Sequence, residues 1–198
     1  MANRKYDYPI ASLHAYRNKF DVSHSVKGSF KHGRLIPFDV MEILPGDTIS
    51  CDLASIIRMS TPIAPIMDNI HMQYDAWYVP NRLVDDHFEQ IMGANKDGAW
   101  LTDEGTYVVP KVPCAAGAVT DYISPMSIGD YMGLPISGTG RGLVSVYPGR
   151  GYSLIWNENY RSQVVSAPLP IDHSSNNKVL VSDVDYTTRP VIIKISSR

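Results

Sequence analysis

Hydrophobic and polar residues alternate in two stretches of the first half of the chain. In residues 48–60 one face collects Ile49, Cys51, Leu53, Ile57 and Met59, and in residues 69–79 one face collects Ile70, Met72, Tyr74, Ala76 and Tyr78. A period of two is typical of a strand with one buried face. We therefore expect both stretches to be strands of an antiparallel sandwich, with these side chains buried: Leu53, Ile57, Met72 and Tyr74.

The period changes after Pro80, where the pattern predicts a helix over residues 82–92. Asn81 is suited to cap its start and Gly93 to end it in a left-handed conformation. The predicted apolar stripe consists of Leu83, Val84, His87, Phe88 and Ile91. Asp85 and Asp86 suit the positive end of a helix dipole.

Two further helices are predicted in the second half of the chain. In residues 124–135 Ser124 is the expected cap, Pro125 the first helical residue, and Gly133 with Pro135 the stop. In residues 151–161 one helical face collects Tyr152, Ile155, Trp156 and Tyr160. The pattern thus places short helices between strands.

Turn residues separate these elements. Pro45, Gly46 and Asp47 form a turn signal, and two prolines in residues 61–66 predict a connection or an edge. A short strand is expected at residues 107–112, a loop at 163–177, and two late strands at 178–186 and 189–197. Together these segments predict a mostly β fold with long proline-rich connections.

Length and composition indicate one globular domain. The chain has 198 residues, of which 44% are hydrophobic and 19% charged, so global disorder is excluded. Cys51 and Cys114 are too few for a disulfide framework, and we expect both to be buried free thiols. The first 20 residues contain no apolar core of a signal peptide and no stretch is long enough to span a membrane, so we expect synthesis in a cytoplasm and no membrane partner.

Charge is distributed unevenly along the chain. Residues 1–34 hold seven basic and two acidic residues, a net charge of +5, whereas the remaining residues have a net charge of −7. Aromatic side chains stand between these bases, a combination that favours contact with single-stranded nucleic acid; the alternative is a solvated terminus or a strap onto a neighbouring subunit. The candidate contacts are Arg4, Lys5, Arg17, Lys19, Lys27 and Lys31.

Catalytic and metal-binding patterns are weak. Residues 137–142, "SGTGRG", lack the Lys-Ser/Thr ending of a phosphate-binding loop and precede no helix. Asp21, Ser23 and His24 lie within five residues, an arrangement better explained by local hydrogen bonds than by a catalytic triad. His71 and Asp75 share a strand face but are too few for a closed metal site. We therefore predict no catalytic residue, no metal site and no cofactor.

Several segments, in order and at similar spacing, carry a resemblance to a known family. They include "FDVSHSVKGSFKHGRLIPFDVMEILPGDT" (20–48), "STPIAPIMDNIHMQYDAWYVPNRLV" (60–84), "HFEQIMG" (87–93), "SIGDYMGLP" (127–135) and "YSLIWNENYR" (152–161). These resemble the N-terminal part of the major capsid protein of microviruses, the small circular single-stranded DNA bacteriophages, and especially of the gokushovirus branch. The resemblance covers about residues 20–161.

The resemblance implies a viral jelly-roll β-sandwich with short helices in long loops between strands. It implies a T=1 icosahedral shell of identical copies around single-stranded DNA, located in the virion and made in the host bacterium. The inserted helices and loops would contact neighbouring subunits, with Trp77, Tyr78, Arg82 and Phe88 as candidates. Members of the family continue further, so we expect one domain, residues 1–198, with a basic arm (1–34) and a body (35–198) that lacks the strands found late in the sequences of family members.

Two other classes of protein remain as alternatives. A carbohydrate-binding β-sandwich module predicts exposed aromatic side chains on a concave face. A cupin-like or hydrolytic enzyme predicts a convergent polar pocket or a histidine-rich metal cluster. The aromatic residues are scattered and the six histidines are dispersed along the chain, which disfavours both alternatives.

Overall fold

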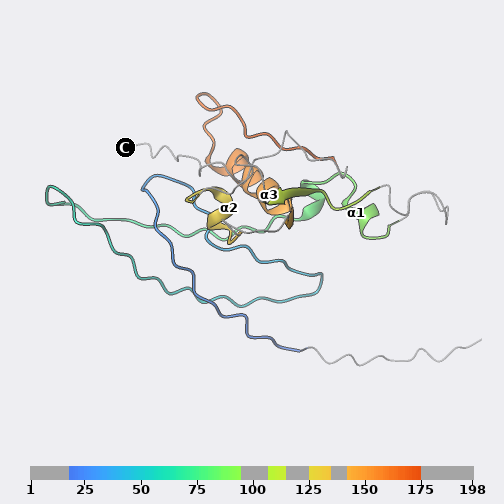
Figure 1. The fold of residues 1–198 in the computed structure, drawn as a ribbon, viewed down its shortest axis with the longest axis horizontal. Coiled ribbons are helices and arrows are strands. Elements are labelled where there is room, and N and C mark those ends of the chain that lie inside the picture. Colours follow the sequence, from blue (N-terminus) through green and yellow to red (C-terminus); the bar gives the residue numbers. More distant parts are fainter. Residues whose placement is uncertain (1–17, 95–106, 115–124, 135–141, 175–198) are drawn as a thin grey trace, which may run out of the picture.

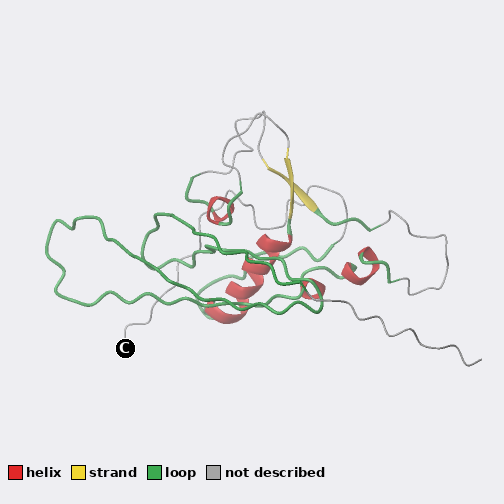
Figure 2. Ribbon diagram, turned by 90° about the horizontal axis from the view of Figure 1, so that it is seen from below, coloured by secondary structure: helices red, strands yellow, loops and turns green. Residues whose placement is uncertain are grey.

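The described helices and strands all lie beyond residue 80. The structure is a computed structural model that describes residues 18–94, 107–114, 125–134 and 142–174. In chain order its elements are η1 (Asn81–Leu83), α1 (Phe88–Ile91), β1 (Lys111–Cys114), α2 (Ile128–Tyr131), β2 (Gly142–Ser145), α3 (Tyr147–Ile155) and η2 (Trp156–Tyr160). Residues 18–80 run as long extended loops beside these elements (Figure 1). In Figure 2 the helices gather near the centre and the loops extend well beyond them.

Helix α3 and the π-helical turn η2 form the longest continuous element. The helix predicted over residues 151–161 is confirmed, but it begins earlier, because Pro148 fits the first helical turn, where its missing N–H has no intrahelical role. One face is buried through Tyr152 and Trp156. The Arg161 backbone N–H donates to the Trp156 carbonyl at 2.8 Å, which closes the π turn.

The two described strands form one small antiparallel sheet. Its register pairs Lys111 with Ser145 and Val112 with Val144. β1 begins later than the strand expected at residues 107–112, and the sequence pattern did not predict β2 at all. The Val146 N–H donates to the Pro110 carbonyl at 3.3 Å, which carries the pairing to the start of α3.

The core assembles around helices rather than between two sheets. Ile128 of α2 packs with Tyr152 of α3, and half-buried apolar side chains surround this pair: Leu35, Met132, Leu134, Val144 and Leu169. Val84, Val146 and Trp156 are also buried. Segments far apart in the chain therefore meet around Ile128 and Tyr152.

The predicted turn signals are confirmed where glycine adopts a positive φ. Gly46 has φ +89°, and the Asp47 N–H donates to the Leu44 carbonyl across this turn. Gly93 and Gly133 have φ of +96° and +81° and directly follow the C-cap residues of α1 and α2. Glycine is favoured at these positions because other residues adopt the left-handed region only with strain.

The helix predicted over residues 82–92 is split, which corrects the expectation of one continuous helix. The Asp86 N–H donates to the His173 carbonyl at 3.1 Å, and the His87 N–H donates to the Asp85 carboxylate at 2.9 Å. Both amides are thereby diverted from the i→i−4 ladder, so η1 ends and α1 starts anew. Asn81 lies within η1 and makes no side-chain cap; Pro80 holds the cap position.

A helix lies within residues 124–135 as predicted, but α2 covers only Ile128–Tyr131, so the prediction of Pro125 as its first residue is wrong, and its cap is a different residue. Ser127 caps it by accepting a hydrogen bond from the Asp130 N–H at 3.4 Å. The predicted cap Ser124 lies outside the described residues, as do residues 137–141 and the two late strands expected at 178–186 and 189–197.

The strands predicted at residues 48–60 and 69–79 are absent from this structure, in which both stretches are neither helical nor paired. Leu53, Ile57 and Met72 are exposed, so the prediction that they are buried is wrong for this chain, while Tyr74 is half-buried and its ring meets that of Phe38 at 5.8 Å. The expected burial of Cys51 is also wrong, since its free thiol is exposed. No described segment supplies the partner strand that the alternating pattern requires.

Candidate subunit interface

Large apolar side chains gather, uncovered, on the extended loops of residues 38–72. Ile56 and Met67 are 91% and 96% exposed. The other exposed apolar side chains of these loops are Val40, Met41, Ile43, Leu44, Ile49, Leu53, Ile57, Met59, Ile63, Ile66, Ile70 and Met72. Burying one such side chain is worth about 1.5–3 kcal/mol, so leaving this set in water is strongly unfavourable. The loops therefore form a candidate interface, named here the apolar loops.

The four predicted subunit contacts take different positions. Tyr78 and Arg82 are exposed. Trp77 is 47% exposed, and its ring and that of Tyr160 meet edge to face with their centres 6.2 Å apart. Phe88 is half-buried and packs edge to face against Tyr147 at 5.9 Å. Tyr78, Arg82 and Trp77 can contact a neighbouring molecule, whereas part of the Phe88 side chain is covered by Tyr147 of the same chain.

The predicted nucleic-acid contacts are only partly described. Lys19, Lys27 and Lys31 are exposed. Arg4, Lys5 and Arg17 lie outside the described residues. The three described lysines are therefore free to meet a partner, and the structure brings no two of them together in a described contact.

Tyrosine hydroxyls attach the extended loops to the helical centre. Tyr131 of α2 donates to the Ser29 carbonyl at 2.7 Å, and Tyr152 of α3 donates to the Leu35 carbonyl at 3.0 Å. Tyr160 of η2 donates to the Asp75 carboxylate. The apolar stripe predicted that Tyr152 and Tyr160 share a helical face. It did not predict these bonds, because their acceptors lie on segments far away in the sequence.

The Asp75 carboxylate is stabilised in its ionised form by this attachment. The Gln73 side chain, which donates to it at 2.9 Å, and then the Tyr160 hydroxyl lower the pKa of Asp75. Burial first, and the bond to Asp75 second, raise the pKa of Tyr160. Hydrogen bonding within the loop therefore explains the polar face formed by Gln73 and Asp75.

A buried polar cluster joins α3 to the segment after η1. Asp85, which is only 1% exposed, accepts hydrogen bonds from the Tyr147 hydroxyl at 3.0 Å and the His87 N–H at 2.9 Å. Arg150 donates to the Val84 carbonyl at 2.8 Å and to the Ser174 carbonyl at 3.0 Å. Burial, followed by the bond to Asp85, raises the pKa of Tyr147. These bonds bind three chain segments together and explain Asp85 better than a helix-dipole role.

The groups suspected of catalysis do not converge. His24 Nδ1 lies 3.0 Å from the Val22 carbonyl and Nε2 lies 3.2 Å from Asp39, so neither nitrogen serves the Ser23 hydroxyl. Ser23 donates instead to Asp21. Across the described ranges no group of three or more His, Cys, Asp or Glu side chains is arranged to hold a metal ion. These same residues also contain no helix that is long and apolar enough to cross a membrane.

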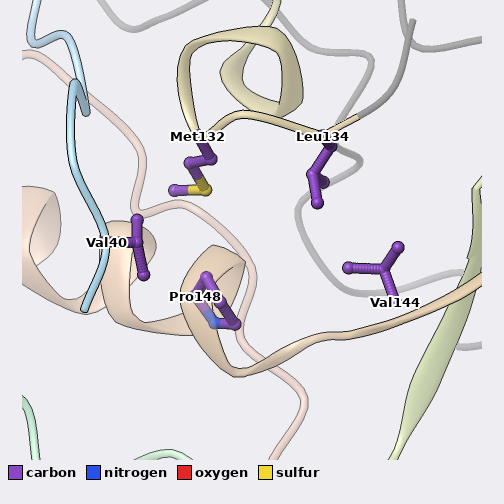
Figure 3. A pocket seen from close by; sticks show the side chains of 5 residues that line it. All are labelled: Val40, Met132, Leu134, Val144 and Pro148. Carbon is purple, nitrogen blue, oxygen red and sulfur yellow. The ribbon is translucent and has the colours of Figure 1, made fainter. Parts of the chain in front are cut away.

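A small hollow between the loops and the helices is apolar. It has a volume of about 160 Å³ and is lined by Val40, Met132, Leu134, Val144 and Pro148 (Figure 3). Figure 3 shows these side chains pointing into the same space from a loop, from the turn after α2, from β2 and from α3. Its lining has no side chain that donates or accepts a hydrogen bond, so it offers nothing to orient a polar substrate.

Comparison with known proteins decides what kind of chain this is. The sequence signature of the family described as "Capsid protein (F protein)" matches residues 9–190. The chain belongs to this phage capsid protein family. A match over most of the chain confirms the resemblance that separate segments indicated.

Three relatives of this capsid family are each named capsid protein VP1. The chain is 38% identical to that of Chlamydia phage 1 over 174 residues, 36% identical to that of Bdellovibrio phage phiMH2K over 154, and 30% identical to that of Spiroplasma virus 4 over 185. These alignments cover 86%, 78% and 90% of this chain. The chain spans only 28%, 27% and 32% of the length of those relatives.

Proposed function

We propose that this chain is a structural part of a virion, a major capsid subunit or the N-terminal part of one, which assembles with other copies into a small icosahedral shell. The observation that carries the proposal is the set of uncovered side chains on the apolar loops, in a chain that belongs to the capsid family. Exposed apolar surface on this scale is typical of a surface that another polypeptide covers. A structural role also fits the absence of converging catalytic groups among the described residues.

The fold we propose for the assembled state is a viral jelly roll. Residues 48–60 and 69–79 alternate apolar and polar side chains and would become strands when paired with other strands. Pairing would satisfy their backbone groups and bury Leu53, Ile57 and Met72 together, because alternation places the whole apolar set on one face. Helices α1, α2 and α3 would then be the insertions that meet neighbouring subunits.

Size measurement of the purified chain tests the proposal. We expect large assemblies or shells by sedimentation velocity and negative-stain microscopy, together with binding of a dye that reports exposed apolar surface in any unassembled fraction. A soluble monomer with a sharp unfolding transition that does not depend on concentration would overturn it. A monomer that binds an oligosaccharide would favour a carbohydrate-binding module, and a monomer that holds a metal ion would favour a cupin-like enzyme.

Packaged single-stranded DNA is the second partner in the proposal. The net charge of +5 in residues 1–34 and the exposed Lys19, Lys27 and Lys31 support contact between the arm and phosphates, without sequence preference. If about four bases engage phosphates, the logarithm of affinity for single strands should fall with the logarithm of salt concentration with a slope of about −3. The place of action would be the virion, after synthesis in the cytoplasm of the host bacterium.

Replacement of Arg4, Lys5, Arg17 and Lys19 by Ala tests the DNA contact. We expect the slope to become shallower, closer to zero, and the affinity for single-stranded DNA at low salt to decrease. The matched control replaces four basic residues of the body together by Ala: Arg58, Arg82 and Lys111, which are exposed, and Lys96. Binding that does not respond to salt, or that is unchanged in the arm variant, would refute contact between the arm and DNA.

A further inference from the structure

The His24 ring lies between two oxygen atoms that can only accept a hydrogen bond. Its Nδ1 lies 3.0 Å from the Val22 carbonyl oxygen, and its Nε2 lies 3.2 Å from a carboxylate oxygen of Asp39. A carbonyl and an ionised carboxylate have no proton to donate, so each ring nitrogen must supply the proton of its own contact. A neutral imidazole carries a proton on only one nitrogen. Only the protonated ring, with an N–H at both positions, can therefore make both contacts.

Loss of one proton makes one of the two contacts repulsive, whichever nitrogen loses it. If the proton stays on Nδ1, the Nε2 lone pair faces the negative Asp39 carboxylate; if it stays on Nε2, the Nδ1 lone pair faces the Val22 carbonyl oxygen. The bond to the Val22 carbonyl, and then the charge of Asp39, raise the pKa of His24, which agrees with this geometry. The two contacts of the ring therefore depend on pH.

Asp39 is the charged group that faces this ring from the neighbouring segment. On the segment of His24 itself, the Asp21 carboxylate accepts hydrogen bonds from the backbone and the side chain of the residue two positions on. The bases nearest in sequence are Lys19 and Lys27, and both are exposed. Asp39 is also the one charged side chain of the described residues that contributes to the raised pKa of His24. The protonation of His24 is therefore coupled mainly to Asp39.

The contact between His24 and Asp39 joins the described part of the basic arm to the body. Among the residues that the structure describes, no other hydrogen bond or ion pair links residues 18–28 to residues beyond them. Apolar burial adds little, because the large apolar side chains of this segment are exposed: Phe20, Val22 and Val26. The chain is attached again at Ser29, whose carbonyl accepts a hydrogen bond from a tyrosine hydroxyl of α2. Loss of the His24 contact therefore frees residues 18–28 as one segment.

We propose that His24 is a pH-sensitive latch, which holds residues 18–28 beside Asp39 while its ring carries both protons and releases them when the ring loses one. Low pH closes the latch, and a rise in pH opens it. Exposed ion pairs contribute little to the stability of a fold, so the latch controls the position of this segment and not the stability of the helical centre. Its release would change how Lys19 and Lys27 are presented to DNA. That consequence rests on the proposed DNA contact, whereas the latch itself does not.

Distances between two spin labels in the full chain, measured by double electron–electron resonance, test the latch. Cysteines that carry nitroxide labels replace the exposed Val26 in the segment and the exposed Val165 in the body, after Cys51 and Cys114 have been replaced by Ser. Labelled copies are diluted with unlabelled copies, so that only distances within one copy contribute. We expect a narrow distribution of distances at low pH that broadens as the pH rises, over about two pH units and with a midpoint above about pH 6.5. An unchanged distribution between about pH 5 and pH 9 would overturn the inference.

Three substitutions separate the latch from other effects of pH. His24→Gln keeps a polar side chain but cannot titrate, so its distribution of distances should not change with pH. Asp39→Asn should lose most of the response, because its amide can donate to a neutral ring as well as accept from a protonated one. His32→Gln is the matched control, since it removes another exposed histidine of the arm and should retain the full response. A response that persists in His24→Gln or Asp39→Asn, or that is lost in His32→Gln, would refute the latch.

The size of the assemblies, measured on the same samples, keeps this inference distinct from the proposed function. Large assemblies in which the distances do not respond to pH would refute the latch and leave the structural role standing. Monomers in which the distances do respond would support the latch and count against the proposed assembly.

Discussion

Replacement of Asp85 by Ala tests whether the buried polar cluster holds α3 in place. Asp85 is almost completely buried and accepts hydrogen bonds from the Tyr147 hydroxyl and the His87 N–H. The substitution leaves both donors without an acceptor. A buried donor without a partner costs about 1–3 kcal/mol, but the half-buried Tyr147 can turn toward water, so we expect a total loss of about 2–3 kcal/mol.

Hydrogen–deuterium exchange of the α3 amides, followed by mass spectrometry, measures this loss. The method reports local opening and works equally on assembled protein. Since about 1.4 kcal/mol corresponds to a factor of ten, exchange in residues 147–155 should become about 30- to 150-fold faster in Asp85→Ala. Asp85→Asn keeps one side-chain oxygen as an acceptor and should give a smaller acceleration.

Asp86→Ala is the matched control. The Asp86 side chain is exposed, and its backbone N–H, which donates to the His173 carbonyl, is retained in the variant. A surface substitution of this kind is expected to change stability by no more than about 0.5 kcal/mol. Exchange in Asp85→Ala within about threefold of the parent chain, or equal acceleration in Asp86→Ala, would refute the assigned role of the cluster.

Three further predictions follow from local geometry. The raised pKa of Tyr147 means that the folded chain favours the neutral phenol, so this contribution to stability should be intact below about pH 10 and decline as the pH rises above it. In Tyr147→Phe the protection of the α3 amides from exchange should therefore decrease less steeply at alkaline pH. The pKa of His24 is raised by the bond to the Val22 carbonyl and by Asp39, so site-resolved histidine exchange should show a lower His24 pKa in Asp39→Asn. A His24 pKa that does not change in this variant would contradict the pairing. Gly133→Ala should destabilise the end of α2 by about 1–2 kcal/mol, because φ is +81° and the added methyl group gains no packing contact that could offset the backbone strain. Unchanged hydrogen exchange of the α2 amides would contradict this prediction.

Local chemistry explains what the sequence by itself determined. Gly46, Gly93 and Gly133 were correctly predicted as turn or stop positions because a positive φ depends on the residue and its immediate neighbours. The helix around Tyr152 and Trp156 was predictable because its apolar stripe repeats at helical spacing. Family membership was also accessible from sequence, since several ordered segments agree independently.

Only the tertiary structure decided which partners these segments meet. The split of residues 82–92 depends on a hydrogen bond from Asp86 to His173, far along the chain, and no local pattern encodes that contact. The burial of Asp85 and Arg150 likewise requires segments that meet only in space. Alternation at residues 48–60 shows that an apolar face exists but not what covers it. In this chain no described segment covers that face, because a strand's stability comes from a neighbouring strand and not from its own pattern.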